Sequence, residues 1–170
     1  KRWRIEHAQV VNKNDFSLFS QYTIIPSVQP THATSDMRWA EERLGKERIH
    51  GAYAYQSLLK QNGLIALGTD FPVENIYPLE TYYAAVERKD KTGSPSDGFM
   101  KNEALTPEQT LRGMTIWAAL ASFEDAEKGS LEVGKMADMV ILDKDILKVS
   151  GTKILETKTL STYVNGEKVY

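Results

Sequence analysis

Cysteine is absent from this 170-residue sequence. Disulfide scaffolds, thiolate nucleophiles and cysteine-ligated metal sites are therefore excluded, and His, Asp and Glu remain as the strong metal ligands. An excess of basic residues is also absent, because 21 Lys and Arg stand against 23 Asp and Glu. Without positive charge to neutralise phosphates, we expect no nucleic-acid partner. No apolar run approaches the roughly 20 residues that span a bilayer, so we expect no membrane partner either.

What is present is an ordinary globular composition, with 41% hydrophobic and 26% charged residues. A chain of this length can bury one sizeable core, which fits one domain or most of one domain with an appendage. The sequence opens with KRWRIEHAQV, which is typical of the inside of a strand and contains no initiator methionine. We therefore expect this chain to be a piece of a longer protein.

Strand-like runs alternate with helical patterns over residues 1–129. The predicted strands are 3–10, ending near His7, then 23–30, and then the fully apolar LIAL at 64–67. The predicted helices are 15–22, 34–44, 52–62, 79–86 and 106–121. An apolar run between helices is typical of a strand buried on both faces, which indicates a parallel sheet. We therefore expect an α/β fold.

Local signals predict several boundaries of these elements. Asn14 is a candidate cap for the first helix, Thr34 or Ser35 for the second, and the run TPEQ at 106–109 forms a capping box. Pro26 lies inside the second strand-like run and favours an edge strand or an irregular strand over a regular central one.

The pattern changes after about residue 130. The run MVIL at 139–142 predicts a strand, and the alternation around Asn165-Gly166 predicts a hairpin. We therefore divide the chain into residues 1–129, which alternate strands and helices, and residues 130–170, which form a small β element. Three strand–helix units are far fewer than the eight of a (β/α)8 barrel, so such a barrel would be represented by about half.

Three candidate ligands follow the predicted strands: His7, His32 and Asp70. The carboxyl ends of parallel strands meet at one face, where active sites lie. Two imidazoles and a carboxylate are ligands of hydrolytic zinc, which lowers the pKa of its bound water to about 7. An adjacent carboxylate can take the proton of that water. The alternative interpretation is structural, with core histidines and an aspartate that bonds its own turn. His50 precedes a helix and is interpreted as a surface or capping residue.

Several motifs occur together in an order typical of one group of metal-dependent hydrolases. They are EHAQ at 6–9, QPTHATSD at 29–36, LIALGTDFPVE at 64–74, LTPEQTLRGMTIWAA at 105–119 and GSLEVGKMADMVILD at 129–143. On this ordered set the sequence resembles the C-terminal half of members of the amidohydrolase superfamily. It is most similar to the amidohydrolase-3 branch, which includes YtcJ-like proteins and N-substituted formamide deformylases. The resemblance implies the C-terminal part of a TIM-like (β/α)8 barrel for residues 1–129, and strands of a composite β-sandwich for residues 130–170.

The resemblance also implies roles for the three candidate ligands. His7 matches a metal ligand at the end of the fifth strand, and His32 a sixth-strand residue that binds a second metal or polarises the substrate carbonyl. Asp70 matches the residue after the eighth strand, which binds metal and acts as base toward water and then as acid toward the leaving nitrogen. The implied reaction hydrolyses an amide or related C–N bond of a small-molecule substrate. It needs one or two divalent ions, with zinc the first choice.

Parts of the family pattern have no match in this sequence. The paired first-strand histidines, H-x-H, and the carboxylate that bridges two metals are absent, and residues 45–55 contain no clear seventh strand. We expect the site to be completed by the missing N-terminal half of the same protein or by another copy in a homo-oligomer, so that this chain alone is inactive. The alternative is a non-catalytic structural or regulatory domain that keeps the hydrolase fold without a complete metal site.

Overall fold

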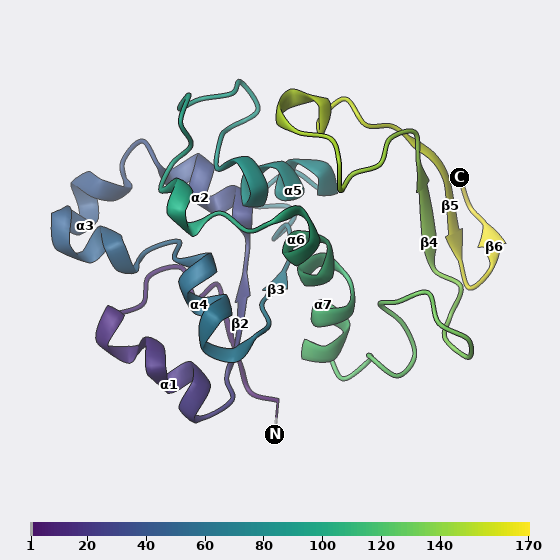
Figure 1. The fold of residues 1–170 in the computed structure, drawn as a ribbon, viewed down its shortest axis with the longest axis horizontal. Coiled ribbons are helices and arrows are strands. Elements are labelled where there is room, and N and C mark those ends of the chain that lie inside the picture. Colours follow the sequence, from purple (N-terminus) through teal and green to yellow (C-terminus); the bar gives the residue numbers. More distant parts are fainter. Residues whose placement is uncertain (1) are drawn as a thin grey trace.

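The computed structural model describes residues 2–170 and contains two separate three-stranded sheets (Figure 1). The first sheet is parallel, with β1 (Arg4–Glu6), β2 (Ile25–Val28) and β3 (Ala66–Leu67) in that order. The parallel sheet predicted from the alternating pattern is therefore confirmed. Of the two alternatives for Pro26, the edge strand is wrong, because β2 lies between β1 and β3. In this short strand Ile25 N–H still donates to the Trp3 carbonyl and the Val28 carbonyl accepts from Gly68, so the ladder tolerates a proline.

Four helices pack around the parallel sheet. α1 (Phe16–Gln21) packs on α4 (Tyr55–Asn62), α4 packs on β2, and α6 (Pro107–Met114) and α7 (Ile116–Ala121) pack on β3. Short 3-10 helices complete the connections: η1 (Lys13–Asp15), η2 (Ile49–Gly51), η3 (Lys101–Glu103) and η4 (Gly151–Lys153). Val28, Leu58 and Ile65 are fully buried in the resulting core. This core fixes the strands whose ends carry the candidate ligands.

Two further helices lie at the carboxyl ends of the strands (Figure 1). α2 (Pro30–Asp36) follows β2 directly, and α5 (Pro78–Glu87) packs against α2. The helix predicted over 34–44 is therefore wrong at its start. Pro30 begins α2 because its fixed φ suits the first turn of a helix. A separate helix, α3 (Ala40–Arg48), follows and is interrupted at Gly45, where φ is 77°.

Two other helix starts also differ from the prediction. Asn14 does not cap α1; instead its N–H donates to the Asn12 side chain at the start of η1. Helix α4 begins later than residue 52, because Ala52 forms an isolated antiparallel bridge with Val10. These contacts tie the chain after β1 to the chain before α4.

The single helix predicted over 106–121 is interrupted at Thr115, where φ is −125° and ψ is −99°. The Thr115 hydroxyl donates to the Leu111 carbonyl, a bond that competes with regular helix geometry. The predicted capping box is confirmed: the Thr106 hydroxyl accepts from the Gln109 N–H, and the Gln109 side chain accepts from the Thr106 N–H.

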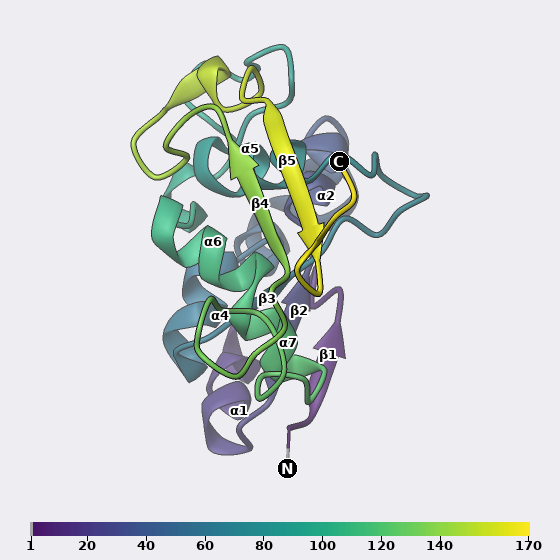
Figure 2. The same cartoon turned by 90° about the vertical axis from the view of Figure 1, so that its right-hand side faces the viewer.

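The second sheet is antiparallel and consists of β4 (Met139–Leu142), β5 (Thr159–Val164) and β6 (Glu167–Lys168). The predicted hairpin is confirmed, with Asn165 and Gly166 both at positive φ between β5 and β6. Figure 2 shows β4 and β5 side by side, and Figure 1 shows them apart from the parallel strands. The connection between β4 and β5 contacts α5, where the Tyr82 hydroxyl donates to the Ile146 carbonyl.

The domain boundary after residue 129, the barrel and the sandwich all stay predictions. Residues 2–170 contribute three strands of an open parallel sheet and one antiparallel sheet. Among the helices of these residues, none has both the length and the apolarity needed to cross a bilayer.

Candidate metal centre

The three predicted ligand residues leave the carboxyl ends of neighbouring strands. His7 comes directly after β1, His32 lies in the first turn of α2 after β2, and Asp70 follows β3 by three residues. β2 pairs directly with β3, with Ser27 opposite Ala66. The resemblance implies a strand between those of His32 and Asp70, but residues 45–55 add none to this sheet. The direct pairing therefore places His32 and Asp70 on adjacent strands.

The side chains of these residues converge. One ligand atom from each of His7, His32 and Asp70 lies within 4.8 Å of the other two. His32 Nε2 is 3.5 Å from Asp70 Oδ2. The rings of His7 and His32 are stacked, with 5.7 Å between centroids and 8° between planes. The structure thus brings together all three residues that the sequence singled out.

The chemistry of this donor set fits a divalent ion. His32 Nε2 is buried and has no hydrogen-bond partner within residues 2–170. Its separation from Asp70 Oδ2 is too long for a good hydrogen bond, and an unpaired buried nitrogen costs free energy. Two imidazoles and a carboxylate at this spacing could share an ion such as zinc. The ligands differ in burial, since His32 is buried, Asp70 half-buried and His7 exposed.

Three of the nine non-glycine residues with positive φ within residues 2–170 lie at or beside the candidate ligands. His7, Ala8 and Asp70 have φ values of 67°, 36° and 57°, a left-handed region that favours glycine. Such residues cost roughly 1–3 kcal/mol each and persist where the surrounding structure holds them. Strain of this kind is concentrated at functional sites, which makes these loops candidates for a function beyond folding.

A hydrogen-bonded cluster beside the ligands was not predicted. Gln9 Nε2 donates to Asp36 Oδ2 at 2.7 Å, and the Tyr53 hydroxyl donates to the same oxygen at 2.9 Å. Tyr53, which the sequence indicates as a core residue, is 1% exposed, and burial raises its pKa to about 12. The sequence offers one signal for this cluster, which is spacing: Gln9 follows His7 by two residues, and Asp36 follows His32 by four.

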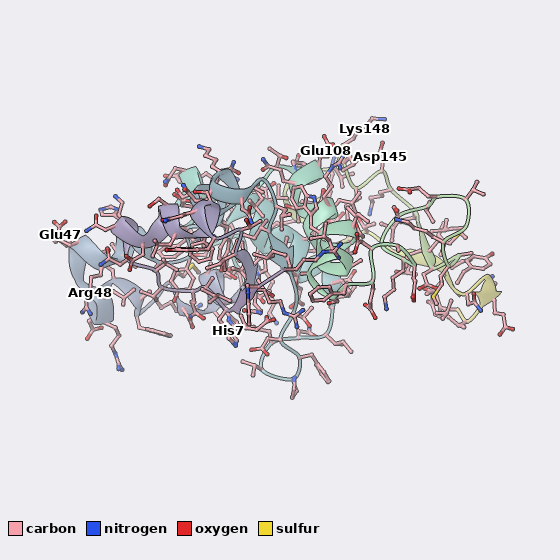
Figure 3. The ribbon with its side chains drawn as sticks, turned by 90° about the horizontal axis from the view of Figure 1, so that it is seen from below. His7, Glu47, Arg48, Glu108, Asp145 and Lys148 are labelled. Atoms are coloured by element: carbon pink, nitrogen blue, oxygen red, sulfur yellow. The ribbon has the colours of Figure 1, made fainter. Side chains whose placement is uncertain are left out.

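The third histidine lies away from the centre, as predicted. His50 is exposed in η2 and is not among the converging residues. In Figure 3, His7 lies well apart from Glu47 and Arg48 at the end of α3. The converging histidines are therefore those that follow strands of the parallel sheet.

Comparison with known proteins identifies the family. The family model described as "Amidohydrolase family" matches residues 1–170. The chain belongs to the amidohydrolase family. The amidohydrolase-superfamily resemblance stated from the sequence is thereby confirmed.

Curated relatives match this amidohydrolase chain over part of their own length. LONG AFTER FAR-RED 3 of Arabidopsis thaliana is 39% identical over 175 residues, which cover 100% of this chain and 29% of that protein. The protein named as an amidohydrolase, YtcJ, of Bacillus subtilis (strain 168) is 28% identical over 98% of this chain and 32% of its own length. N-substituted formamide deformylase of Arthrobacter pascens is 33% identical over 67% of this chain and 20% of its own length. The chain spans about a third or less of these relatives.

A solved structure shows the same mixed α/β fold. The uncharacterized metal-dependent hydrolase from Pyrococcus horikoshii OT3 superposes with a TM-score of 0.76 at 33% sequence identity. The match covers 86% of this amidohydrolase chain and 29% of that hydrolase. The arrangement that carries His7, His32 and Asp70 is thus a fold of the family.

Proposed function

We propose that this chain supplies His7, His32 and Asp70 to the divalent-metal centre of a hydrolase that cleaves an amide or related C–N bond in a small molecule. The observation that carries the proposal is the convergence of these residues around His32 Nε2, which is buried and lacks a partner among residues 2–170. A histidine packed for purely structural reasons would normally have both ring nitrogens satisfied.

The bond type rests on the family and on the names of relatives. The formamide deformylase of Arthrobacter pascens is named for an N-substituted formamide, which contains an amide C–N bond. The hydrolase from Pyrococcus horikoshii OT3 is described as metal-dependent. Both names fit a centre of two imidazoles and a carboxylate, and zinc is the ion that this donor set suggests first.

Each side chain has a proposed task. A bound divalent ion supplies Lewis acidity, which makes water acidic enough to serve as a nucleophile near neutral pH. Asp70 accepts the proton of the attacking water and returns it to the leaving nitrogen, because a carboxylate beside the ligands can serve as base and then as acid. His32 lies 3.5 Å from that carboxylate and can polarise the substrate carbonyl or hold a second ion. His7 is exposed, its ring stacks on that of His32, and one of its ring nitrogens would bind the same ion.

We further propose that the missing N-terminal half of the same polypeptide completes the centre and a TIM-like barrel. All three residues of β1 are exposed, and β1 is an open edge of the described sheet. A cavity of about 510 Å³ borders this edge and His7, with apolar side chains such as Ile5, Val10 and Leu18 in its lining. An open edge leaves backbone N–H and C=O groups of β1 unpaired, so a neighbouring strand would stabilise it.

The test compares two aspartate substitutions in the full-length gene product. Elemental analysis should find one or two equivalents of zinc, iron or manganese in the unaltered protein. Asp70→Asn should abolish hydrolysis of amide substrates, including N-formyl amines, and leave the circular dichroism spectrum unchanged. The matched control is Asp97→Asn, because Asp97 is an exposed residue in the connection between α5 and η3; this variant should keep full activity.

Two results would contradict the proposal. Unchanged turnover in Asp70→Asn would remove the assigned role of that carboxylate. Absence of metal from the unaltered protein, even after reconstitution, would favour the alternative of a non-catalytic structural or regulatory domain. The absence of H-x-H from this sequence is the observation that keeps this alternative worth testing.

A further inference from the structure

We propose that Gln9, Asp36 and Tyr53 form a positioning cluster that fixes the distance between His7 and His32. The inference rests on the proposed function, because the distance matters only if both histidines hold the same ion. None of the three residues is assigned as a ligand. Their role would be to hold the two ligand-bearing segments in one arrangement.

The cluster connects the segments that carry the two histidines. Asp36 lies four residues after His32 in α2, so both project from the same face of that helix. Gln9 lies two residues after His7 and donates to Asp36 Oδ2 at 2.7 Å. The hydrogen bond therefore joins the loop of one candidate ligand to the helix of the other.

A second hydrogen bond joins the same two segments on the other side of the histidines. Glu6 pairs with Ser27 in the β1–β2 ladder, and the Ser27 hydroxyl donates to Glu6 Oε2 at 2.7 Å. His7 and His32 lie between this link and the Gln9–Asp36 link along the chain. Two hydrogen bonds, one on each side of the ligand pair, restrict the movement of the two segments along and away from each other.

The loop after β1 needs this restraint. His7 and Ala8 hold left-handed conformations with φ values of 67° and 36°, so their relaxed backbone would take another path. Backbone bonds hold the loop on one side, since Tyr53 N–H donates to the Gln9 carbonyl at 2.8 Å and Val11 N–H to the Gly51 carbonyl at 2.9 Å. These bonds lead to residues 51–53 and not to α2. The side chains of the cluster make the connection to α2.

Tyr53 restricts the orientation of the Asp36 carboxylate, which accepts the hydrogen bond from Gln9. Its hydroxyl donates to Asp36 Oδ2 at 2.9 Å and also lies 3.3 Å from Gln9 Nε2. Its ring is 1% exposed and packs edge-on against Phe99. A carboxylate that accepts two hydrogen bonds on one oxygen, one of them from a buried and rigid donor, has little freedom to rotate away from Gln9.

The test uses matched tyrosine variants of the full-length gene product. Tyr53→Phe removes the hydroxyl bond to Asp36, and Tyr82→Phe removes a hydroxyl bond of the same length, 2.9 Å, to the Ile146 carbonyl. Both rings are 1% exposed, and burial raises the pKa of each hydroxyl to about 12. The two variants should therefore lower the unfolding temperature of the metal-free protein by similar amounts.

Only the cluster variant should change metal binding. Zinc affinity, measured by competition with a chromogenic chelator, should fall about 10-fold in Tyr53→Phe and about 10-fold or more in Gln9→Leu, the range typical of residues that orient metal ligands. Tyr82→Phe should bind zinc like the unaltered protein. The visible spectrum of the cobalt-substituted protein should change in the first two variants and stay the same in the third.

The outcomes separate this inference from the proposed function. If the unaltered protein binds zinc and Tyr53→Phe and Gln9→Leu bind it equally well, the positioning cluster is overturned and the metal centre stands. Equal losses of affinity in Tyr53→Phe and Tyr82→Phe would also overturn it, because the effect would then be general destabilisation. If the unaltered protein binds no zinc, the proposed metal centre and this inference are both overturned.

Discussion

In the parallel sheet, β2 and β3 bury nearly all their residues beneath helices of the same chain. In the antiparallel sheet, Val140, Ile141 and Leu160 remain 54%, 46% and 56% exposed. The two sheets are similarly apolar, and they differ in what covers them. Within residues 2–170, helices cover β2 and β3 closely, whereas β1 and the antiparallel sheet stay largely exposed. His32 and Asp70 therefore follow strands that the chain itself buries, while His7 follows the exposed edge strand β1.

The two sheets also differ in the left-handed residues of their loops. The left-handed residues His7, Ala8 and Asp70 all belong to loops of the parallel sheet. In the antiparallel sheet, the left-handed non-glycine residue among those described is Asn165, in a hairpin turn where asparagine is well tolerated. The composite sandwich, in which a second sheet would cover β4 and β5, stays a prediction.

The largest expected effect is on metal binding at the ends of the parallel strands. His7→Ala should weaken zinc binding by the full-length protein by at least about 100-fold, because a direct ligand should matter more than a residue that only orients one. His50→Ala is the matched control, since His50 is exposed in η2 and outside the converging group. Isothermal titration with zinc checks both. Equal zinc affinities for the two variants would contradict the assignment of His7 as a ligand and of the metal centre to the ends of the parallel strands.

The next effect is on the free energy of unfolding. Leu58→Ala should destabilise the protein by about 2–5 kcal/mol, because Leu58 is fully buried in the core under the parallel sheet. Leu160→Ala, in the antiparallel sheet, should change it by less than about 0.5 kcal/mol if this face is uncovered. Denaturant titration gives both values. A large loss in Leu160→Ala in the full-length protein would sharpen the comparison by indicating that a second sheet covers β5 there.

A smaller effect is expected in helix α6, which lies between the two sheets in Figure 1. Thr106→Ala should cost about 1 kcal/mol, because it removes one half of the capping box. Glu108→Ala, an exposed change in the same turn, is the control and should cost less. If thermal unfolding gives the same midpoint for both variants, the cap does not stabilise α6.

The smallest effect is on the dependence of stability on pH. Burial alone would raise the pKa of Asp90, but hydrogen bonds from Thr92 and Ser94 outweigh it and lower that pKa below its ordinary value. Its carboxylate therefore stabilises the fold above about pH 4, and this contribution is lost as the pH falls through the lowered pKa. Asp90→Asn should destabilise at pH 7 and match the unaltered protein near pH 2. A constant difference across that range, in unfolding followed by fluorescence, would contradict this assignment.

Much of the fold could be predicted from local pattern. LIAL at 64–67 indicates a buried strand. The residue types at Asn165-Gly166 favour a hairpin turn, and those at 106–109 favour a capping box. Helix ends that depend on tertiary contacts could not be found in this way. Thr34 or Ser35 is the predicted cap of a helix, but both lie inside α2, and the Ser35 hydroxyl donates to the Glu74 carboxylate, 39 residues away in the chain.

The ligands of the candidate site could be predicted from the sequence, but the residues that position them could not. His7, His32 and Asp70 were found because strand ends in parallel sheets converge, a rule that needs only the strand assignments. The link from Gln9 to Asp36 comes directly after the left-handed turn at His7 and Ala8, which contains no Gly, Asn or Asp to signal it in the sequence. Periodicity places Tyr53 in the core, and the bond from its hydroxyl to Asp36 is visible only in three dimensions.

The most direct test of the metal centre is a crystal structure of the zinc-loaded full-length protein with anomalous data collected at the zinc edge. We predict a peak at about 2.0–2.2 Å from a ring nitrogen of His7, a ring nitrogen of His32 and a carboxylate oxygen of Asp70. A zinc peak elsewhere in the protein, with these three side chains free of metal, would contradict the account.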